Sequence, residues 1–124
     1  MGVVLDHTIL AATDQDAAAV FLADLVGVEV GPRVGPFTPV RVNNDLTLDF
    51  EERATVTPSH FGFLVDDATF DRLLEELGSP PYELFGSGPE HGWDGSINRL
   101  AGGRGIYVGD PDGHVYEFFT AVPD

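Results

Sequence analysis

The hydrophobic pattern of the chain repeats once along its length. The first copy is the apolar run H-T-I-L-A-A-T-D from His7, and the second is H-F-G-F-L-V-D-D from His60. Each run is rich in residues that favour β-strands and starts on a histidine. Six positions later each reaches a residue predicted to cap a helix, Thr13 or Asp66. The repeat therefore predicts two similar modules, each opening with a strand that leads into a helix.

Two amphipathic helices are expected after these strands. The first is predicted over about residues 14–26 with Gly27 ending it, and the second over about residues 68–77 with Gly78 ending it. Each has apolar side chains at the spacing of one helix face. These side chains are Ala18, Phe21, Leu22 and Leu25 in the first helix, and Phe70, Leu73, Leu74 and Leu77 in the second.

Short β-rich segments separated by turn residues follow each helix. The predicted strands are residues 28–30, 38–42 and 46–51 in the first module, and residues 82–84, 105–108 and 114–120 in the second. The order of one strand, one helix and three strands therefore occurs twice. We expect an α+β fold in one domain, residues 1–124, with one βαβββ module over about residues 1–56 and another over about residues 57–124.

Residues 86–103 interrupt this symmetry. The segment is rich in glycine and polar residues, and it shows neither strand nor helix periodicity. A long stretch without regular structure inside a compact domain usually carries function. We expect this loop to cover a site, with Trp93 either as a lid residue or as an anchor that pins the loop, and with His91 exposed to solvent.

One histidine and one carboxylate occupy corresponding positions in the two modules. His7 and His60 begin the first strands, and Asp49 and Glu117 lie on the last strands. The symmetry that relates the modules would map each histidine and each acid onto its counterpart. Two histidines and one or two carboxylates that converge from symmetric strands suit a divalent metal ion with open coordination positions.

Strand parity strengthens the case for Glu117. Side chains two residues apart share a face of a strand, so Glu117 lies between Val115 and Phe119 on one face. A carboxylate among apolar neighbours is costly to bury unless it is paired, hydrogen-bonded or metal-bound. On the strand of the second histidine, Gly62 leaves space on the same face. His114 points to the side opposite Glu117 and is expected at the surface or in the turn.

The charge of the chain excludes some classes of partner. Six arginines and no lysine stand against 21 acidic residues, so the net charge is −15. Nucleic acids and anionic membrane surfaces bind clustered basic residues, and neither is expected as a partner. The charge favours a neutral or cationic small ligand.

The lack of cysteine excludes disulfides, thiolate metal ligands and a cysteine nucleophile. No apolar run reaches the ~18–20 residues of a membrane span. The N-terminal residues carry no basic region of the kind found in signal peptides. We therefore expect a cytoplasmic protein.

Three segments resemble the vicinal oxygen chelate superfamily, which includes glyoxalase I, extradiol dioxygenases, fosfomycin-resistance enzymes and bleomycin-binding resistance proteins. They are L-D-H-T-I-L at 5–10, S-H-F-G-F-L-V-D-D at 59–67 and Y-V-G-D-P-D-G-H-V-Y-E-F-F at 107–119. The third segment is the most specific, because D-P-D-G followed by a strand ending in glutamate is a hallmark of that superfamily.

This resemblance implies a cupped, mixed β-sheet built from paired βαβββ modules. It also implies that His7, His60 and Glu117 are metal ligands, and that Asp49 is a fourth ligand or a proton-abstracting base. Chains of this length usually form homodimers, in which His7 and Asp49 of one subunit meet His60 and Glu117 of the other. The divalent metal ion would be Fe, Mn, Ni, Zn, Co or Mg.

We therefore expect a divalent-metal enzyme, either a glyoxalase-like lyase or isomerase or a dioxygenase-like enzyme, acting on a small oxygenated substrate that chelates the ion. Asp49 and Glu117 would be its catalytic residues. Substrate contacts are expected from Trp93, Asn98, Arg99 and Tyr107. Asn98 stands about where the extradiol signature has a catalytic histidine, which argues against ring cleavage. The scarcity of basic residues argues against the anionic substrates of glyoxalase I and the fosfomycin enzymes.

Two alternatives remain at this point. One is a metal-free protein of the bleomycin-resistance type, which would sequester a cationic or aromatic compound in the groove of a dimer. The other is a structural or regulatory dimer without a small ligand, in which the repeated histidines and acids would have no role.

Overall fold

The computed structural model describes residues 2–122 and divides them into two compact units, with the boundary between Thr57 and Pro58. Each unit contains one helix of more than one turn and one mixed β-sheet. The expected α+β class is confirmed. The second unit has the predicted order βαβββ, whereas the first has two strands instead of three after its helix. None of the described helices has the length and apolar character needed to cross a membrane.

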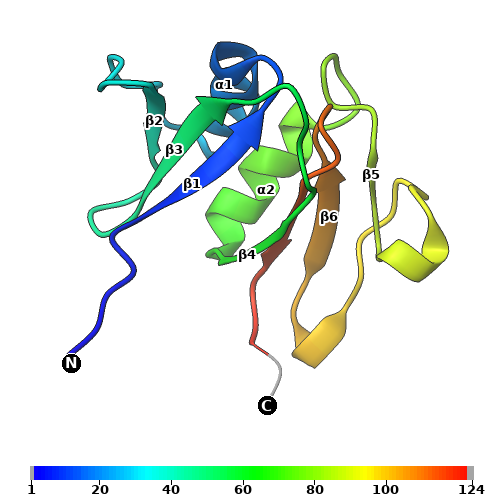
Figure 1. Cartoon of the computed structure of the whole chain (residues 1–124). Helices are drawn as coiled ribbons and strands as arrows, with labels where there is room; N and C mark the ends of the chain where they lie inside the picture. Colours follow the sequence, from blue (N-terminus) through cyan, green and yellow to red (C-terminus); the bar gives the residue numbers. More distant parts are fainter. Residues whose placement is uncertain (1, 123–124) are drawn as a thin grey trace. The chain divides into compact units, whose positions relative to one another are not determined.

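The first unit contains β1 (His7–Ala12), α1 (Gln15–Val26), β2 (Phe37–Arg41) and β3 (Thr47–Glu52). Its sheet has the order β1-β3-β2, with β1 parallel and β2 antiparallel to the central strand (Figure 1). The helix lies against this sheet and contacts all three strands.

Alternation along the strands divides the side chains of the first unit between two faces. The buried strand residues are Leu10, Ala12, Thr38, Val40, Leu48 and Phe50. The buried apolar side chains of α1 include Phe21, Leu22 and Leu25, as its helical spacing predicts. Because His7 and Asp49 have the other parity, they lie on the sheet face that points away from this core.

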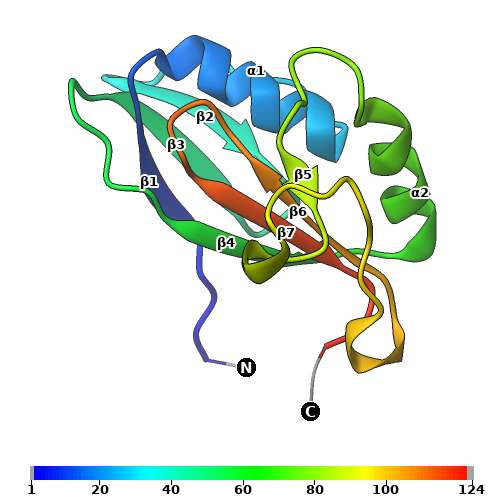
Figure 2. The same ribbon diagram turned by 90° about the vertical axis from the view of Figure 1, so that its right-hand side faces the viewer.

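The second unit contains β4 (His60–Leu64), α2 (Asp67–Glu76), β5 (Phe85–Gly86), β6 (Gly105–Gly109) and β7 (Val115–Phe119). The strand order is β4-β7-β6-β5, with β4 parallel to β7 and the other pairs antiparallel (Figure 2). Two short 3-10 helices, Pro89–His91 and Leu100–Gly102, lie in the segment between β5 and β6.

The core of the second unit is largely aromatic. Its fully buried side chains include Phe70, Leu73, Ile106, Val108, Tyr116 and Phe118. The Phe63 ring stacks on Phe118, with centroids 5.3 Å apart, and also contacts Tyr116. Glu117 therefore lies on the face of β7 opposite this core, as strand parity predicts.

Three details of the sequence prediction are wrong. Asp14, not Thr13, caps α1, and its carboxylate accepts the backbone N–H of Ala17 at 3.1 Å. Residues 28–30 do not form a strand, because the N–H of Val28 still bonds to a carbonyl of α1 and only Val30 bridges to β2.

Residues 82–84 are also not a strand. The N–H of Tyr82 closes a turn onto the carbonyl of Ser79, and strand pairing with β6 begins only at Phe85. The cap of α2 at Asp66 is confirmed, since its carboxylate accepts the N–H of Thr69 at 2.8 Å. The left-handed Gly27 ends α1 as expected.

Candidate metal and substrate site

His60 and Glu117 lie side by side on the open face of the second unit. They come from the parallel neighbours β4 and β7, where Glu117 is in register with Gly62. The His60 Nε2 atom is 2.9 Å from Glu117 Oε1, and 53% of the histidine side chain is exposed against 19% of the glutamate. The histidine and the acid that the repeat singles out in this half are therefore direct partners.

Gly62 provides the space for this pair. A Cβ atom at this position would lie 3.2 Å from the Phe119 ring and 3.9 Å from Glu117 Oε1. A larger side chain would therefore crowd both the phenyl ring and the carboxylate. The glycine keeps the carboxylate approachable from the face that His60 occupies, as the sequence predicts.

Tyr107 is the third member of this face. It is the cross-strand partner of Glu117 on β6, and its ring centroid lies 5.8 Å from that of His60. Burial raises the pKa of the Tyr107 hydroxyl, and the negative charge of Glu117 adds to this shift. The hydroxyl therefore stays protonated at neutral pH and can donate a hydrogen bond to the carboxylate.

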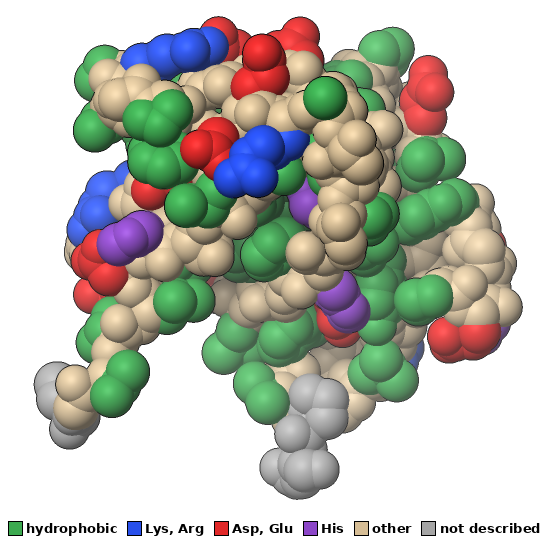
Figure 3. Space-filling model, in the orientation of Figure 1, with side chains coloured by type: hydrophobic (Ala, Val, Ile, Leu, Met, Phe, Trp, Pro, Cys, Tyr) green, Lys and Arg blue, Asp and Glu red, His purple; other side chains and the backbone are tan. Residues whose placement is uncertain are grey.

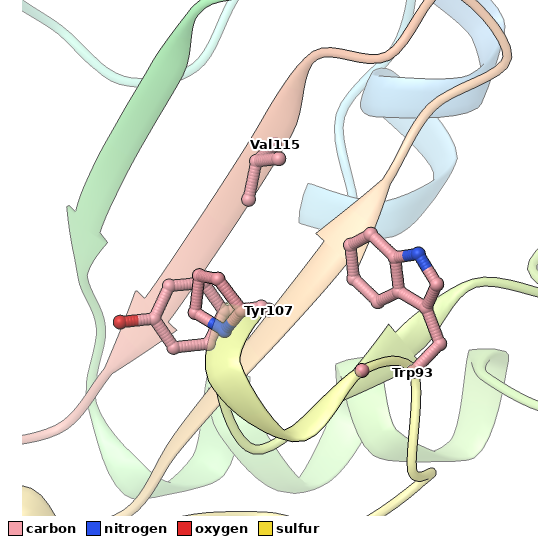
Figure 4. A pocket seen from close by; sticks show the side chains of 5 residues that line it. Trp93, Tyr107 and Val115 are labelled. Atoms are coloured by element: carbon pink, nitrogen blue, oxygen red, sulfur yellow. The ribbon is translucent and has the colours of Figure 1, made fainter.

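A small apolar pocket opens beside Tyr107. Its volume is about 180 Å³, and its lining residues are Pro89, Gly92, Trp93, Tyr107 and Val115. Trp93 comes from the loop after β5, Tyr107 from β6 and Val115 from β7 (Figure 4). Of the four predicted substrate residues, the structure thus brings Trp93 and Tyr107 together.

Two glycines on β6 let the loop lie on the open face of the strand. A Cβ at Gly109 would meet the Trp93 indole at 2.9 Å, and one at Gly105 would meet the Asn98 side chain at 2.6 Å. Both glycines share a strand face with Tyr107. The expected covering role of the loop thus has a structural basis, although the segment is more regular than its sequence suggests.

Asp94 organises this loop. Its carboxylate accepts hydrogen bonds from the Ser87 hydroxyl at 2.6 Å, the Ser87 N–H at 2.9 Å and the Ser96 N–H at 3.0 Å. These bonds, the Ser87 hydroxyl first, lower the pKa of Asp94 from 3.8 to about 2. No pattern in the sequence singles out Asp94, because its partners are identifiable only once the loop has folded.

The low pKa of Asp94 predicts an acid-induced loosening of the loop. A carboxyl group whose pKa is lowered in the folded state stabilises that state above its ordinary pKa and loses this effect as the pH falls through the lowered value. The fluorescence of Trp93, the one tryptophan in the chain, is therefore expected to stay constant from pH 7 to about 4 and to shift to the red between about pH 4 and 2.

Asp94→Ala should show the red-shifted Trp93 emission already at pH 7. Glu90→Gln, in the same loop but outside the hydrogen bonds of Asp94, is the control and should behave as wild type. Far-ultraviolet circular dichroism must stay unchanged over the same range. An Asp94→Ala spectrum that matches wild type at pH 7 would show that the carboxylate does not hold the loop.

The other two predicted substrate residues have different surroundings. The Asn98 side chain donates to the carbonyl of Ser87 at 3.0 Å and accepts from the Leu100 N–H at 3.2 Å, so it braces the loop. Arg99 lines a separate open hollow of about 380 Å³. Arg104, in the same hollow, is ion-paired with Asp67 and Asp71 of α2.

His7 and Asp49 lie on the open face of the first unit. His7 Nδ1 is 3.0 Å from a carboxylate oxygen of Asp6. This hydrogen bond, with the charges of Asp6 and Asp49, raises the pKa of His7. Asp49 is in register with Ile9 and Pro39, and therefore has apolar neighbours on both sides.

Figure 3 shows histidine side chains (purple) at the surface with acidic side chains (red) directly beside them. Within either unit, however, the described residues contain no group of three or more histidine and carboxylate side chains able to hold a metal ion. Each unit therefore offers at most a partial set of ligands.

His114 lies on the side opposite Glu117 and is bonded to the D-P-D-G turn as expected, but the alternative of a surface position is wrong. Its side chain does not lie at the surface but is 2% exposed, and Nδ1 accepts the backbone N–H of Ser59 at 3.0 Å. Asp110, at the start of the turn, accepts the N–H groups of Asp112 and His114. Burial raises the pKa of Asp110. The D-P-D-G motif signals this turn, whereas the contact to Ser59 is long-range and has no sequence signal.

His91 is exposed on the loop as expected, with Nδ1 2.9 Å from the Ser87 hydroxyl.

No protein-family model and no curated protein matches the chain. Several solved structures, however, match the chain. "Oxidase ChaP-H2" is 42% identical with a TM-score of 0.91, and the match covers 99% of this chain and 97% of that one. "Oxidase ChaP-H1" is 43% identical with a TM-score of 0.90, and the match covers 98% of each chain.

More distant structures share the fold. The fosfomycin resistance protein FosX from Listeria monocytogenes is 19% identical with a TM-score of 0.71, and the match covers 100% of this chain and 95% of that one. A glyoxalase/bleomycin resistance protein from Catenulispora acidiphila is 19% identical with a TM-score of 0.69, at 97% and 100% coverage.

The chain belongs to the vicinal oxygen chelate superfamily, as the sequence motifs predict. Within that superfamily it is similar over nearly its full length to the two proteins named as oxidases. A second group of neighbours with the same fold carries other names, fosfomycin resistance protein and glyoxalase/dioxygenase among them.

Proposed function

We propose that this protein is a metal-dependent oxidase of the vicinal oxygen chelate superfamily, acting on a small, planar, oxygenated substrate. The observation that carries the proposal is the 42–43% identity to two proteins named as oxidases, across nearly all of the chain. The paired His60 and Glu117 support it from the structure, because they supply a nitrogen and an oxygen ligand at one point of the sheet.

The ligand chemistry fits a first-row divalent ion. His60 and Glu117 would supply an imidazole nitrogen and a carboxylate oxygen, both of which first-row divalent ions accept as ligands. His7 would be the third ligand, giving two histidines and one carboxylate. This set with open positions is typical of non-haem Fe(II) oxygenases, so iron is the preferred ion among Fe, Mn, Ni, Zn, Co and Mg.

His7 is prepared for this role by Asp6. When the N–H at His7 Nδ1 donates a hydrogen bond to the Asp6 carboxylate, Nε2 keeps a lone pair that can bind a metal ion. Histidines that bind metals usually donate their second ring N–H to a carboxylate or carbonyl in this way. Asp49, on the same open face, would be a fourth ligand or the base that takes a proton from a substrate hydroxyl.

We also propose a homodimer, in which His7 and Asp49 of one copy join His60 and Glu117 of the other. The open faces carry apolar side chains that a second copy would cover. Ile9 on β1 is 50% exposed and Leu64 on β4 is 61% exposed, while Leu5, before β1, is 64% exposed. A soluble chain rarely leaves so much apolar surface next to polar functional groups unless a partner or ligand binds there.

The pocket beside Tyr107 indicates a planar substrate. At about 180 Å³ it is smaller than the ~300–1,000 Å³ pockets of drug-sized ligands. The Trp93 and Tyr107 rings offer flat apolar surfaces for a substrate ring, and Pro89 and Val115 exclude water from it. Tyr107, which stays protonated, would hold the Glu117 carboxylate by a hydrogen bond.

His7, His60 and Glu117 would hold the ion, which would supply Lewis-acid and redox chemistry toward vicinal oxygens of the substrate, with dioxygen as the electron acceptor. The protein would supply orientation. The Trp93 and Tyr107 rings would fix the plane of the substrate ring, and the Tyr107 ring centroid lies 5.8 Å from that of His60, so the substrate would be bound close to the proposed ligands. Asp49, if the open faces meet as proposed, would receive the proton that the substrate loses.

Metal analysis tests this proposal. Protein purified without chelator and loaded with Fe(II) without oxygen is expected to retain about one ion per site by elemental analysis. His60→Ala should lose the ion, and His91→Ala, which changes an exposed loop histidine, should keep it. The loaded protein should then consume dioxygen with 1,2-dihydroxynaphthalene, a planar diol, as a probe.

Two results would contradict the proposal in different ways. Failure to retain any of the six candidate ions would favour the metal-free sequestering protein, for which quenching of Trp93 by cationic aromatic compounds is the next measurement. Equal metal content in wild type and His60→Ala would leave metal binding intact but place it elsewhere.

A further inference from the structure

We infer that His114 is a positioning residue, which fixes the direction of His60 through the backbone of Ser59. This inference rests on the proposed function, because it assigns His60 to the metal ion. His114 is one of the largest fully buried side chains among the described residues, and it shares the parity of the core residues Tyr116 and Phe118.

The protonation state of His114 follows from its contact. Its Nδ1 atom lies 3.0 Å from the backbone nitrogen of Ser59. A backbone N–H can only donate, so Nδ1 must carry a lone pair and the ring proton must be on Nε2. The buried ring is therefore neutral, and it acts as the acceptor for the residue that directly precedes His60.

Ser59 is held from both of its polar backbone atoms. Its N–H goes to the His114 ring, and its carbonyl accepts the N–H of Val115 at 2.9 Å. The backbone of β4 is thereby fixed one residue before His60, and both anchors come from consecutive residues at the start of β7. Glu117 lies on this same strand, so the anchors from β7 fix the position of His60 relative to its acidic partner.

His114 is in turn fixed by the turn that precedes β7. Its N–H donates to Asp110 Oδ1 at 2.9 Å, its carbonyl accepts the Asp110 N–H at 2.9 Å, and the Phe61 ring packs edge-on at 6.0 Å. The ring therefore has little freedom to rotate. An apolar side chain of similar size would fill the space but would leave the Ser59 N–H without its acceptor.

A matched pair of variants separates positioning from packing. In His114→Asn the side-chain oxygen can take the place of Nδ1 as acceptor, whereas His114→Phe fills the volume without an acceptor. Titration of the full-length protein with Mn²⁺, followed by electron paramagnetic resonance, should give an affinity within about threefold of wild type for His114→Asn. His114→Phe should bind about tenfold more weakly, the lower end of losses caused by supporting residues.

A purely structural role predicts another pattern. Both variants would then melt at lower temperature but bind Mn²⁺ as wild type, which would overturn the inference. Amide exchange of Ser59 should be faster in His114→Phe only. If His114→Phe does not fold, the wild-type long-range proton–nitrogen spectrum still decides, because a His114 ring protonated on Nδ1 would overturn the inference.

Failure of the proposed function gives a separate result. If wild type binds no Mn²⁺ or other candidate ion, the orientation of His60 is measured by nuclear Overhauser contacts with the Tyr107 ring, 5.8 Å away between centroids. These contacts should persist in wild type and His114→Asn and disappear in His114→Phe. Their persistence in all three proteins would refute the positioning role without reference to any metal.

Discussion

Glu117→Gln is expected to weaken metal binding by more than about 100-fold and to abolish metal-dependent turnover. The amide has no negative charge and is a poor ligand, and it also ends the charge-assisted pairing with His60 at 2.9 Å. Because supporting residues alone account for losses of about 10- to 100-fold, loss of a ligand should exceed that range. Equilibrium dialysis against Mn²⁺ measures the affinity.

The fold should survive this substitution. Glutamine has nearly the volume of glutamate, and Glu117 lies on the face opposite the aromatic core. Glu76→Gln, at the exposed end of α2, is the matched control and should bind metal as wild type does. Metal affinity that is equal in Glu117→Gln and Glu76→Gln would remove Glu117 from the proposed ligand set.

Phe118→Ala is expected to have the largest effect on stability, about 3–5 kcal/mol. The Phe118 side chain is completely buried and stacks on Phe63 with an angle of 18° between the ring planes. Its loss removes apolar burial and leaves a cavity in a core whose neighbours are rings of fixed shape. Domains of this kind are stable by about 5–15 kcal/mol, so the variant should be close to unfolding.

The adjacent residue provides the control for this prediction. Phe119→Ala changes the same side chain one position along β7, on the open face, where the ring is only partly buried. Urea unfolding followed by circular dichroism should give a loss well below that of Phe118→Ala. Equal losses from the two substitutions would mean that the opposite faces of β7 are not divided between core and site as described.

The strands and helices could be predicted wherever apolar residues recur at the regular spacing of a strand or a helix. Alternation along β7 places Phe118 in the core and Glu117 outside it, and the three- and four-residue spacing in α1 and α2 predicts both helices. The prediction failed where residues satisfy their hydrogen bonds locally. Val28 and Tyr82 lie in β-rich segments, yet their N–H groups return to Ala23 and Ser79 instead of joining a sheet.

The site was predictable in part, because strand alternation and the internal repeat both single out His60 and Glu117. His60 and Glu117 share a strand face and a place in the repeat, and the structure brings them into contact. Residues of the long loop follow no period, so their surroundings could not be predicted. Asn98 braces the loop, and Asp94 organises it through three hydrogen bonds that join residues seven or fewer positions apart. The hydrogen bond between Ser59 and His114 joins residues 55 positions apart, and no sequence pattern predicts it.

The position of the Trp93 indole in the aromatic pocket depends on the absence of a side chain at Gly109. Trp93 rests directly on the α-carbon of Gly109, where even a methyl group would come within 2.9 Å of the indole. The backbone angles of Gly109 lie outside the left-handed region that only glycine favours, so other residues are conformationally possible there. One nucleotide change that replaces this glycine would push the indole outward and reshape the pocket, while His60 and Glu117 stay untouched. Related genes could therefore diverge in ligand size by a single mutational step that leaves the proposed metal ligands His60 and Glu117 in place.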